Sequence, residues 1–546
     1  MTGNEPINLA DVSTSSGSYG RWIVLGLSAF SLTGNYFAYD MPAALNGQLM
    51  DYLGFDYYDW QYYLAMMYVV YSIPNIFLPF AIGPLIDIHG TRKVFLALSG
   101  VVIIGQLLFT IGLIMQMLPL ILLGRLFLGI GGESLGVAQA RITYHWFNIK
   151  ELGFALGINL CFARLGSVFN DFISPYIAER YGGVNSASCF ALLMCFISGI
   201  CAFFFILADY AGELRVKMKI RQRLFVSIPG NKRFSGQLIG IPENGNIRSS
   251  YFSVVSEGSS RPGDRLEQPM KFSDIYRFPT EFWVLCVVMV CFYGSTIPFI
   301  NIGSDLLQKK WLGPDPITAG ALLSIPDLVS TLLLPFSGFL MNFLGCRMLI
   351  MIVCAGTIGF VHWSFALTSW SPIPGLVGLG CMSAIYASFF WPTISLFIEE
   401  SYIATAYAVA TAFLNTFLCF APLIVASLVA QDPQYVWVET FFGFLVCAGL
   451  VGLLALWLID SWWGSSILSR SMCSQSPFQD EPDFSDTDDE YYEETEEVYG
   501  DPEVNADTIH SNNSYFENRI NSGTWRREKA PLIRTADHPI IYGAAL

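Results

Sequence analysis

Two charged residues stand inside long apolar runs of this sequence. Glu133 lies in the run Leu123–Phe147, and Arg164 lies in the apolar run that follows it. At 1.5 Å per helical residue, Glu133 is about 14 residues, or roughly 21 Å, into the predicted helix 119–146, and Arg164 is about 12 residues into the predicted helix 152–178. Consecutive membrane helices run in opposite directions, so both charges are expected near mid-membrane. Charges at that depth face a partner or a watery cavity and commonly mark a functional site.

The two side chains have complementary binding chemistry. The Glu133 carboxylate can hold an ammonium group, and the planar guanidinium of Arg164 can pair with a carboxylate through two hydrogen bonds. A zwitterionic ligand carries both groups. The small residues Gly129, Gly131 and Gly132 precede Glu133 and would let backbone or ligand approach closely. The alternative is a structural ion pair that only locks two helices together.

Further polar residues are candidates for gating or coupling. Arg125 lies more than two helical turns before Glu133, and Asp40 precedes Pro42 near the end of the first apolar run. A structural role, such as a helix cap for Asp40, is the alternative for both. Asp171 lies on the same helical face as Arg164 and could pair with it in one gating state. Asp327 follows a proline, where a broken helix could expose its carboxylate to a cavity.

Aromatic and amide side chains complete the predicted binding face. Tyr36, Phe37, Trp391 and Asn415 are predicted substrate contacts, although aromatics at helical spacing more often serve packing. The isolated histidines, His145 and His362, are expected to be capped or interfacial. The sequence has no nucleophile–base–acid arrangement, phosphate loop or metal-ligand spacing, so we predict neither an enzyme nor a cofactor, a metal site or nucleic-acid binding.

The composition places these residues in a membrane protein. Of 546 residues, 53% are hydrophobic and 13% are charged, whereas soluble domains carry about 25% charged residues. Many runs exceed the ~18 apolar residues that mark a membrane helix. The net charge of −15 lies largely in the stretch Asp480–Glu503, and the 12 cysteines are scattered among apolar runs as expected of small core residues.

The apolar runs predict an all-α membrane protein with twelve transmembrane helices in two six-helix lobes. A first lobe is expected over 21–209 and a second over 280–460, flanked by a tail at 1–20, a basic linker at 210–279 and an acidic, disordered tail at 461–546. The predicted spans are 22–44, 61–84, 93–115, 119–146, 152–178, 187–209, 280–304, 316–341, 347–368, 373–398, 403–429 and 437–460. Lysine and arginine favour cytosolic loops, so the basic linker and both termini are predicted to be cytosolic.

A short motif recurs at the same place in each half. Gly83–Arg92 and Gly338–Arg347 both read G-x-L-x-[D/N]-x-x-G-x-R. The motif places Asp87 and Arg92 in the first half, and Asn342 and Arg347 in the second, at a predicted cytosolic gate. Parallel repeats of this kind are typical of two-lobed transporters with a midplane site between the lobes.

The duplicated motif, together with Arg125, Gly129 and Gly131 in the pattern R-x-x-x-G-x-G, resembles the major facilitator superfamily. Ile88 replaces the usual basic residue, and Asn342 replaces the acid of the second copy. The blocks Tyr36–Leu45, Gly124–Gln139, Ala163–Ser167 and Pro298–Gly303 further resemble the lysosomal dipeptide uniporters of this superfamily. The resemblance covers both membrane halves but neither the linker nor the acidic tail, and it implies that the positions of Glu133 and Arg164 contact substrate.

The carboxyl-terminal tail contains a predicted sorting signal. Glu528, Leu532 and Ile533 fit the acidic dileucine pattern that clathrin adaptors bind. The only N-x-[ST] match, at Asn512, falls on the predicted cytosolic side. The resemblance therefore implies a glycosylated single-span accessory subunit that protects an unglycosylated carrier, as well as a lysosomal, endolysosomal or vacuolar membrane rather than the plasma membrane.

The functional expectation is export of dipeptides from lumen to cytosol by alternating access, with uniport favoured by the resemblance. The first alternative is a proton-coupled carrier of another small organic solute, such as an amino acid or organic anion. The second is a membrane sensor or scaffold that uses its linker and tail to recruit cytosolic partners. For both transporter interpretations, the predicted partners are the lipid bilayer and a small-molecule substrate.

Overall fold

The described part of the chain consists of long helices. The computed structural model describes residues 18–147, 149–226, 275–276, 278–344, 347–398 and 402–462. The first half contains α2 (Ser18–Ala44), α3 (Asn46–Leu53), α4 (Tyr57–His89), α5 (Thr91–Ile114), α6 (Leu118–Trp146), α7 (Ile149–Arg180) and α8 (Val184–Val226). The second contains α10 (Thr280–Leu307), the π-helix η2 (Gln308–Leu312), α11 (Pro316–Leu344), α12 (Arg347–Leu367), α13 (Pro372–Phe397), α14 (Ile403–Leu418), α15 (Ala421–Gln431) and α16 (Val436–Trp462).

These helices agree with an all-α membrane fold. Within the described residues, eleven helices are long and apolar enough to cross a membrane, counting α14 and α15 as one span from Thr405 to Gln431. Helix α2 occupies the first predicted span but is not among the eleven. It carries Arg21, Asn35 and Asp40 along its length and packs against α7 and α8.

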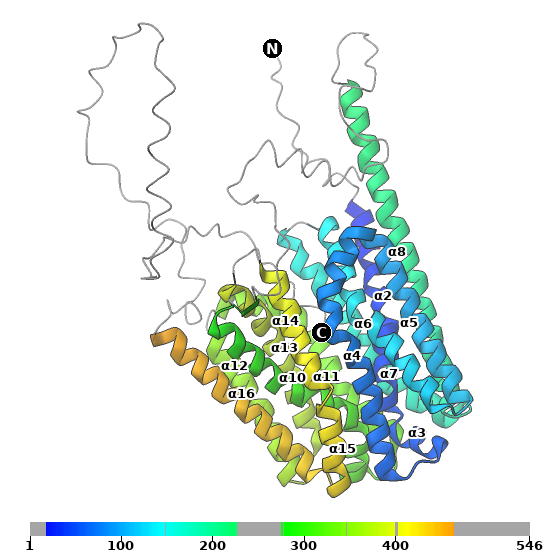
Figure 1. Cartoon of the computed structure of the whole chain (residues 1–546), viewed down its shortest axis with the longest axis vertical. Coiled ribbons are helices and arrows are strands. Elements are labelled where there is room, and N and C mark those ends of the chain that lie inside the picture. The colour runs from blue at the N-terminus through cyan, green and yellow to red at the C-terminus, as the bar shows by residue number, and fades with distance from the viewer. Residues whose placement is uncertain are drawn as a thin grey trace, which may run out of the picture. The chain divides into compact units, whose positions relative to one another are not determined.

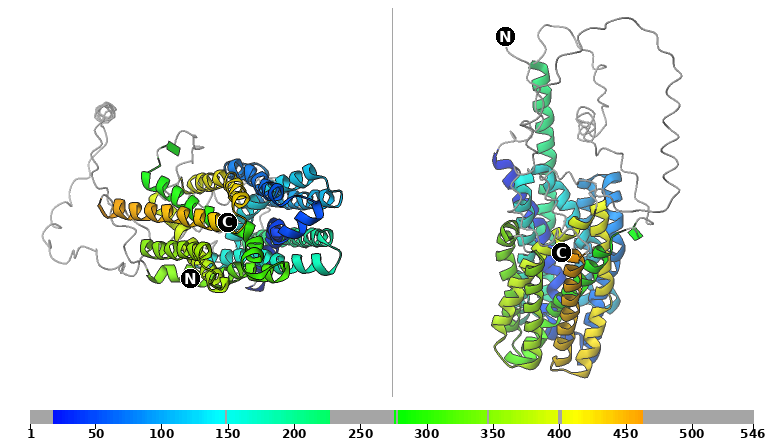
Figure 2. Two further views of the ribbon diagram at one scale, coloured as in Figure 1. Left: turned by 90° about the horizontal axis from the view of Figure 1, so that it is seen from below. Right: turned by 90° about the vertical axis from the view of Figure 1, so that its left-hand side faces the viewer.

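The helices of each half pack around their own apolar core. One buried cluster is drawn from the second half and includes Phe292, Phe390 and Leu453, whereas two others, containing Trp60 and Phe95, belong to the first half. Figures 1 and 2 show the blue-to-cyan helices gathered beside the green-to-orange ones. The two halves meet through α4 against α14 and α15, α7 against α11, and α2 against α10. We call this boundary the inter-lobe seam.

Three local features differ from the predicted spans. Helix α8 continues to Val226, so the sixth span and the first part of the basic stretch form one helix that extends beyond its neighbours (Figure 1). The predicted span 403–429 breaks between Leu418 and Ala421, directly before Pro422, which lacks the amide proton needed to continue the hydrogen-bond ladder. The short helix α3 was not predicted.

Candidate substrate-binding site

Glu133 lies at the inter-lobe seam, on α6 of the first lobe. Its Oε2 accepts a hydrogen bond from Nδ2 of Asn415, on α14 of the second lobe, at 3.2 Å. The preceding glycines allow α6 to approach its neighbours. A Cβ at Gly129 would lie 2.2 Å from the Tyr71 carbonyl oxygen on α4, and one at Gly132 would lie 2.6 Å from the Tyr71 hydroxyl. The glycines therefore serve helix packing that carries Glu133 to the seam.

Arg164 also crosses the seam, but to a different partner. Its Nη1 lies 3.1 Å from Oδ1 of Asp327, on α11 of the second lobe. The Arg164 side chain keeps 22% of its surface exposed, against 8% for Asp327. Glu133 and Arg164 of the first lobe thus each contact a polar side chain of the second lobe.

Aromatic residues surround the two charges. The hydroxyl of Tyr36 has both Arg164 and Glu133 among its electrostatic neighbours, which places this tyrosine close to each of them. Trp391 donates a hydrogen bond from Nε1 to the hydroxyl of Tyr293 at 3.0 Å, and Tyr293 is in turn an electrostatic neighbour of Arg164. Trp391 therefore reaches the Arg164 region through Tyr293.

Phe37 has a different environment from its neighbour Tyr36. Its side chain is fully buried, and its ring centroid lies 5.7 Å from that of Phe190 within the core of the first lobe. Phe37 was predicted to contact substrate, and the structure instead places it in packing.

Arg125 is held within the first lobe. Its guanidinium donates hydrogen bonds to the carbonyl oxygens of Ala38 at 3.1 Å and Tyr39 at 3.0 Å. It also lies over the rings of Tyr39, Tyr68 and Tyr71, at 5.0 to 5.7 Å from their centroids. The contacts correspond to the structural alternative for this residue. Asp40 is buried and has Ser167 as a hydrogen-bond partner.

In the first copy of the duplicated motif, Asp87 lies near the end of α4 and Arg92 lies at the start of α5. Asp87 pairs with Arg141 at 2.8 Å, and Arg92 pairs with Asp209 at 2.6 Å. In the second copy, Arg347 is buried at the start of α12. The Asn342 side chain lies outside the described residues, as do Glu528, Leu532 and Ile533 of the predicted sorting signal.

The lobes are joined at the end that we predict to be luminal. The Tyr57 hydroxyl on α4 donates to Oδ2 of Asp305 on α10 at 2.9 Å, and the Tyr435 hydroxyl also donates to Asp305. The Lys309 ammonium sits 3.1 Å from the centroid of the Tyr57 ring and 3.5 Å from Asp305. We call these four residues, Tyr57, Asp305, Lys309 and Tyr435, the luminal latch.

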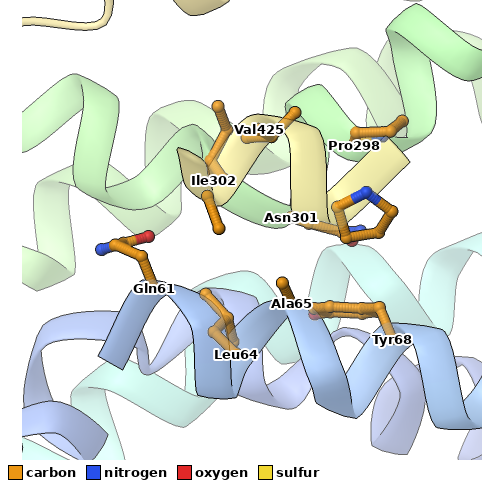
Figure 3. A pocket seen from close by; sticks show the side chains of 10 residues that line it. Gln61, Leu64, Ala65, Tyr68, Pro298, Asn301, Ile302 and Val425 are labelled. Atoms are coloured by element: carbon orange, nitrogen blue, oxygen red, sulfur yellow. The ribbon is translucent and has the colours of Figure 1, made fainter. Parts of the chain in front are cut away.

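A small cavity lies in the seam near the latch. Gln61, Leu64, Ala65 and Tyr68 of α4 face residues of α10 and α15 across it, including Asn301 and Val425 (Figure 3). Its volume is about 20 Å³, whereas one water needs ~10–15 Å³. A cavity of this size has room for a single water molecule and is too small for a dipeptide. At the opposite end of the helices, the pairs Arg21–Glu151, Asp87–Arg141 and Arg92–Asp209 each join residues of the same lobe.

Three contacts in the structure were not predicted from the sequence. The acid Asp327 was noted but not assigned as the partner of Arg164, and the luminal latch was not foreseen, since its members come from distant segments. The third is the fully buried pair His362–Glu439, with 2.8 Å between Nδ1 and Oε2 inside the second lobe. The expectation that His362 is capped or interfacial was therefore wrong, because α16 brings an acid to its buried ring.

The sequence profile of the Major Facilitator Superfamily matches residues 27–306, about half of the chain. The chain belongs to the major facilitator superfamily, as the duplicated motif indicated. A crystal structure of a mutant of the nucleoside transporter NupG has the same fold. It superimposes with a TM-score of 0.53 at 12% identity, covering 80% of this chain and 99% of that one.

The chain is also similar to lysosomal dipeptide transporters. It is 28% identical over 458 residues to the lysosomal dipeptide transporter MFSD1 of Homo sapiens, covering 82% of this chain and 88% of the relative. The MFSD1 protein of Danio rerio is 27% identical over 444 residues, covering 81% and 87%. The resemblance drawn from the sequence blocks is confirmed, and the chain is a multi-pass transporter of this superfamily.

Proposed function

We propose that this chain exports dipeptides from the lysosomal lumen to the cytosol by alternating access. The observation that carries the proposal is the placement of Glu133 and Arg164 at one seam, each touching a polar group of the opposite lobe. A dipeptide zwitterion offers an ammonium to the first and a carboxylate to the second. The names of the relatives support the substrate class and the compartment.

The geometry fits a carrier whose lobes rock about a midplane site. The luminal latch and the close approach of α7 to α11, where a Cβ at Gly320 would lie 2.1 Å from the Asp171 carbonyl oxygen, hold one end of the seam shut. The ion pairs of the other end stay within the first lobe. We therefore infer that this conformation is closed at the luminal end of the seam. The cytosolic side of both termini remains our proposal, based on the basic linker.

Uniport is the proposed basal mode, in which the dipeptide gradient alone drives transport. The acidic dileucine signal remains our proposal for a clathrin-adaptor contact, and a glycosylated single-span subunit remains a proposed partner. Neither is needed for the transport cycle itself.

Counterflow in proteoliposomes tests the proposed function. Vesicles loaded with unlabelled Ala-Ala should accumulate labelled Ala-Ala, whereas vesicles loaded with alanine should not. Exchange of alanine without exchange of Ala-Ala would overturn the dipeptide proposal in favour of an amino-acid carrier. A variant lacking residues 227–274 and 463–546 should keep its flux, and loss of flux in a folded variant would favour the sensor alternative.

A further inference from the structure

Asn415 has an unused hydrogen-bond acceptor at the inter-lobe seam. Its Nδ2 donates to Oε2 of Glu133 at 3.2 Å and to the carbonyl oxygen of Thr411, one turn earlier on α14, at 3.1 Å. The donors of this amide are therefore engaged, whereas its Oδ1 has no hydrogen-bond partner among the described residues. Asn415 is 1% exposed. Because a buried acceptor without a partner costs free energy, this oxygen marks a place for a donor.

A second buried acceptor lies beside the Glu133 segment of α6. Oδ1 of Asn35, on α2, also lacks a hydrogen-bond partner within the part of the chain that the structure describes, and this residue is 4% exposed. A Cβ at Gly132, the residue before Glu133, would lie 3.0 Å from that oxygen. The glutamate is thus approached by one unused amide oxygen from each lobe, that of Asn35 from α2 and that of Asn415 from α14.

A primary ammonium group has the donors that fit these acceptors. Glu133 has no ion-pair partner among the described residues, whereas Arg164 already contacts Asp327. An ammonium carries three N–H donors and no acceptor. One N–H can bind the Glu133 carboxylate, and the other two can bind the amide oxygens of Asn415 and Asn35. A water molecule could donate to the same oxygens, but it brings no counter-charge for the carboxylate.

We propose that Asn415 is the second-lobe half of the ammonium subsite and couples binding of the dipeptide amino terminus to closure of the lobes around it. The ammonium takes the place of the Asn415 amide on Glu133 and donates a second hydrogen bond to Oδ1 of Asn415. One ligand group then binds both lobes, while Asn35 accepts the third N–H within the first lobe. This inference rests on the proposed function and specifies the amino terminus that transport requires.

Binding and transport therefore depend on different numbers of N–H groups. Attraction to Glu133 needs the positive charge and one N–H, whereas closure onto Asn415 needs a second. A dipeptide with a dimethylated amino terminus keeps its charge but has one N–H, so it should bind without being carried. Its isomer with both methyl groups on the α-carbon keeps three N–H groups and the same number of atoms, so it should be carried.

Counterflow with three dipeptides tests the inference, namely Gly-Gly, N,N-dimethyl-Gly-Gly and the isomeric α-aminoisobutyryl-Gly. Vesicles loaded with unlabelled Gly-Gly or with the α-aminoisobutyryl compound should accumulate labelled Gly-Gly. Vesicles loaded with the dimethyl compound should accumulate about tenfold less, the effect of losing one hydrogen bond to a charged group. Added on the same side as the label, the dimethyl compound should inhibit uptake about as well as its isomer does.

Variants of Asn415 assign the effect to this side chain. Asn415→Leu removes the acceptor at similar size, so it should lower Gly-Gly exchange about tenfold and abolish the preference for Gly-Gly over the dimethyl compound. Asn415→Asp keeps an acceptor and should keep that preference. Thr416→Val is the matched control, since this neighbouring hydroxyl donates to the Ala412 carbonyl of its own helix, and it should behave as the parent.

The outcomes separate this inference from the proposed function. Absence of counterflow with every dipeptide would overturn the proposed function. Equal exchange of the two isomers would leave dipeptide transport intact and overturn the role of Asn415, as would a preference that Asn415→Leu retains. A dimethyl compound that neither exchanges nor inhibits would assign the N–H groups to binding alone and overturn the coupling. If Asn415→Leu fails to fold, the two isomers still decide with the unmodified protein.

Discussion

At the scale of single residues, the proposed binding groups contact partners that we expect a substrate to replace. Glu133 accepts one hydrogen bond from Asn415, a neutral amide, and Arg164 pairs with Asp327 through its Nη1 atom. A substrate ammonium would add the attraction of a full positive charge to the Glu133 carboxylate, which the neutral amide of Asn415 cannot supply. In the proposed cycle, these contacts give each charged group a partner that a ligand can replace.

Removing either charge should weaken binding of one end of the substrate. Glu133→Gln should raise the KM for Ala-Ala about 10- to 100-fold, because a hydrogen bond to a charged group contributes roughly 1.5–3 kcal/mol. It should have little further effect on N-acetylated Ala-Ala, which lacks the ammonium. Arg164→Gln should show the matching pattern with Ala-Ala amide, measured by competition in the counterflow assay. If both variants keep the parental KM, the two residues are structural.

The buried pair His362–Glu439 should matter for stability rather than transport. Glu439→Leu leaves the imidazole without its partner in an apolar core, which costs about 1–3 kcal/mol. Thermal unfolding of purified protein should show a lower midpoint for this variant. The double variant His362→Phe with Glu439→Leu should recover part of the loss, because replacing both partners by apolar groups can be nearly neutral. An equal loss in single and double variants would assign the effect to packing alone.

At the scale of elements, α6 positions Glu133 because it packs tightly on α4 and α5. Gly129 faces the Tyr71 backbone on α4, and Gly131 faces Val102 and the Leu98 carbonyl on α5. Small residues let membrane helices approach closely, where van der Waals contact rather than a hydrophobic driving force holds them together. The spacing of these glycines sets both the depth and the direction of the glutamate.

A methyl group at Gly129 should disturb this packing. Gly129→Ala places Cβ where backbone already lies, so we expect a loss of about 1–3 kcal/mol and a displaced α6. The variant should show a lower unfolding temperature and reduced dipeptide flux. Gly100→Ala on α5 is the matched control, since a Cβ there meets nothing within 4 Å. Equal behaviour of the two variants would contradict the packing argument.

At the scale of the whole transporter, we expect the luminal latch to bias the equilibrium between the two access states of the proposed cycle. Its contacts join α4 of the first lobe to the end of α10 and the start of α16 in the second. A conformational equilibrium shifts only by the difference in interaction energy between its states. Losing a charge-assisted contact of roughly 1.5–3 kcal/mol should therefore move the populations about 10- to 100-fold toward the lumen-open state.

Asp305→Ala should open the luminal end of the seam. A reporter cysteine at Gln61, which lies 2% exposed beside the cavity, should react faster with a membrane-impermeant maleimide supplied from the luminal side. The parent carrying the same reporter should react slowly, and the reporter with Asp59→Asn should match that parent. Unchanged labelling with Asp305→Ala would show that the latch does not hold this end closed.

Much of the architecture was predictable from local sequence. Helix formation in a membrane requires every backbone group to be satisfied within its own segment, so apolar runs alone predict spans, and most predicted boundaries lie within a few residues of the helices. The duplicated motif then indicated two lobes, and a charge in an apolar run marked Glu133 and Arg164. These inferences depend on neighbours in the chain and on the properties of the bilayer.

Partners across the seam could only come from the tertiary structure. Hydrophobicity and helical period do not state which face of one helix meets which face of another, so neither the pairing of Arg164 with Asp327 nor that of Glu133 with Asn415 follows from the sequence. The same is true of the burial of Phe37 in a lobe core and of the latch around Asp305. The sequence by itself determined that this protein spans the membrane as a duplicated carrier with charges at its centre. The packing of its lobes decided which charges meet, because contacts between distant segments depend on the relative placement of whole helices.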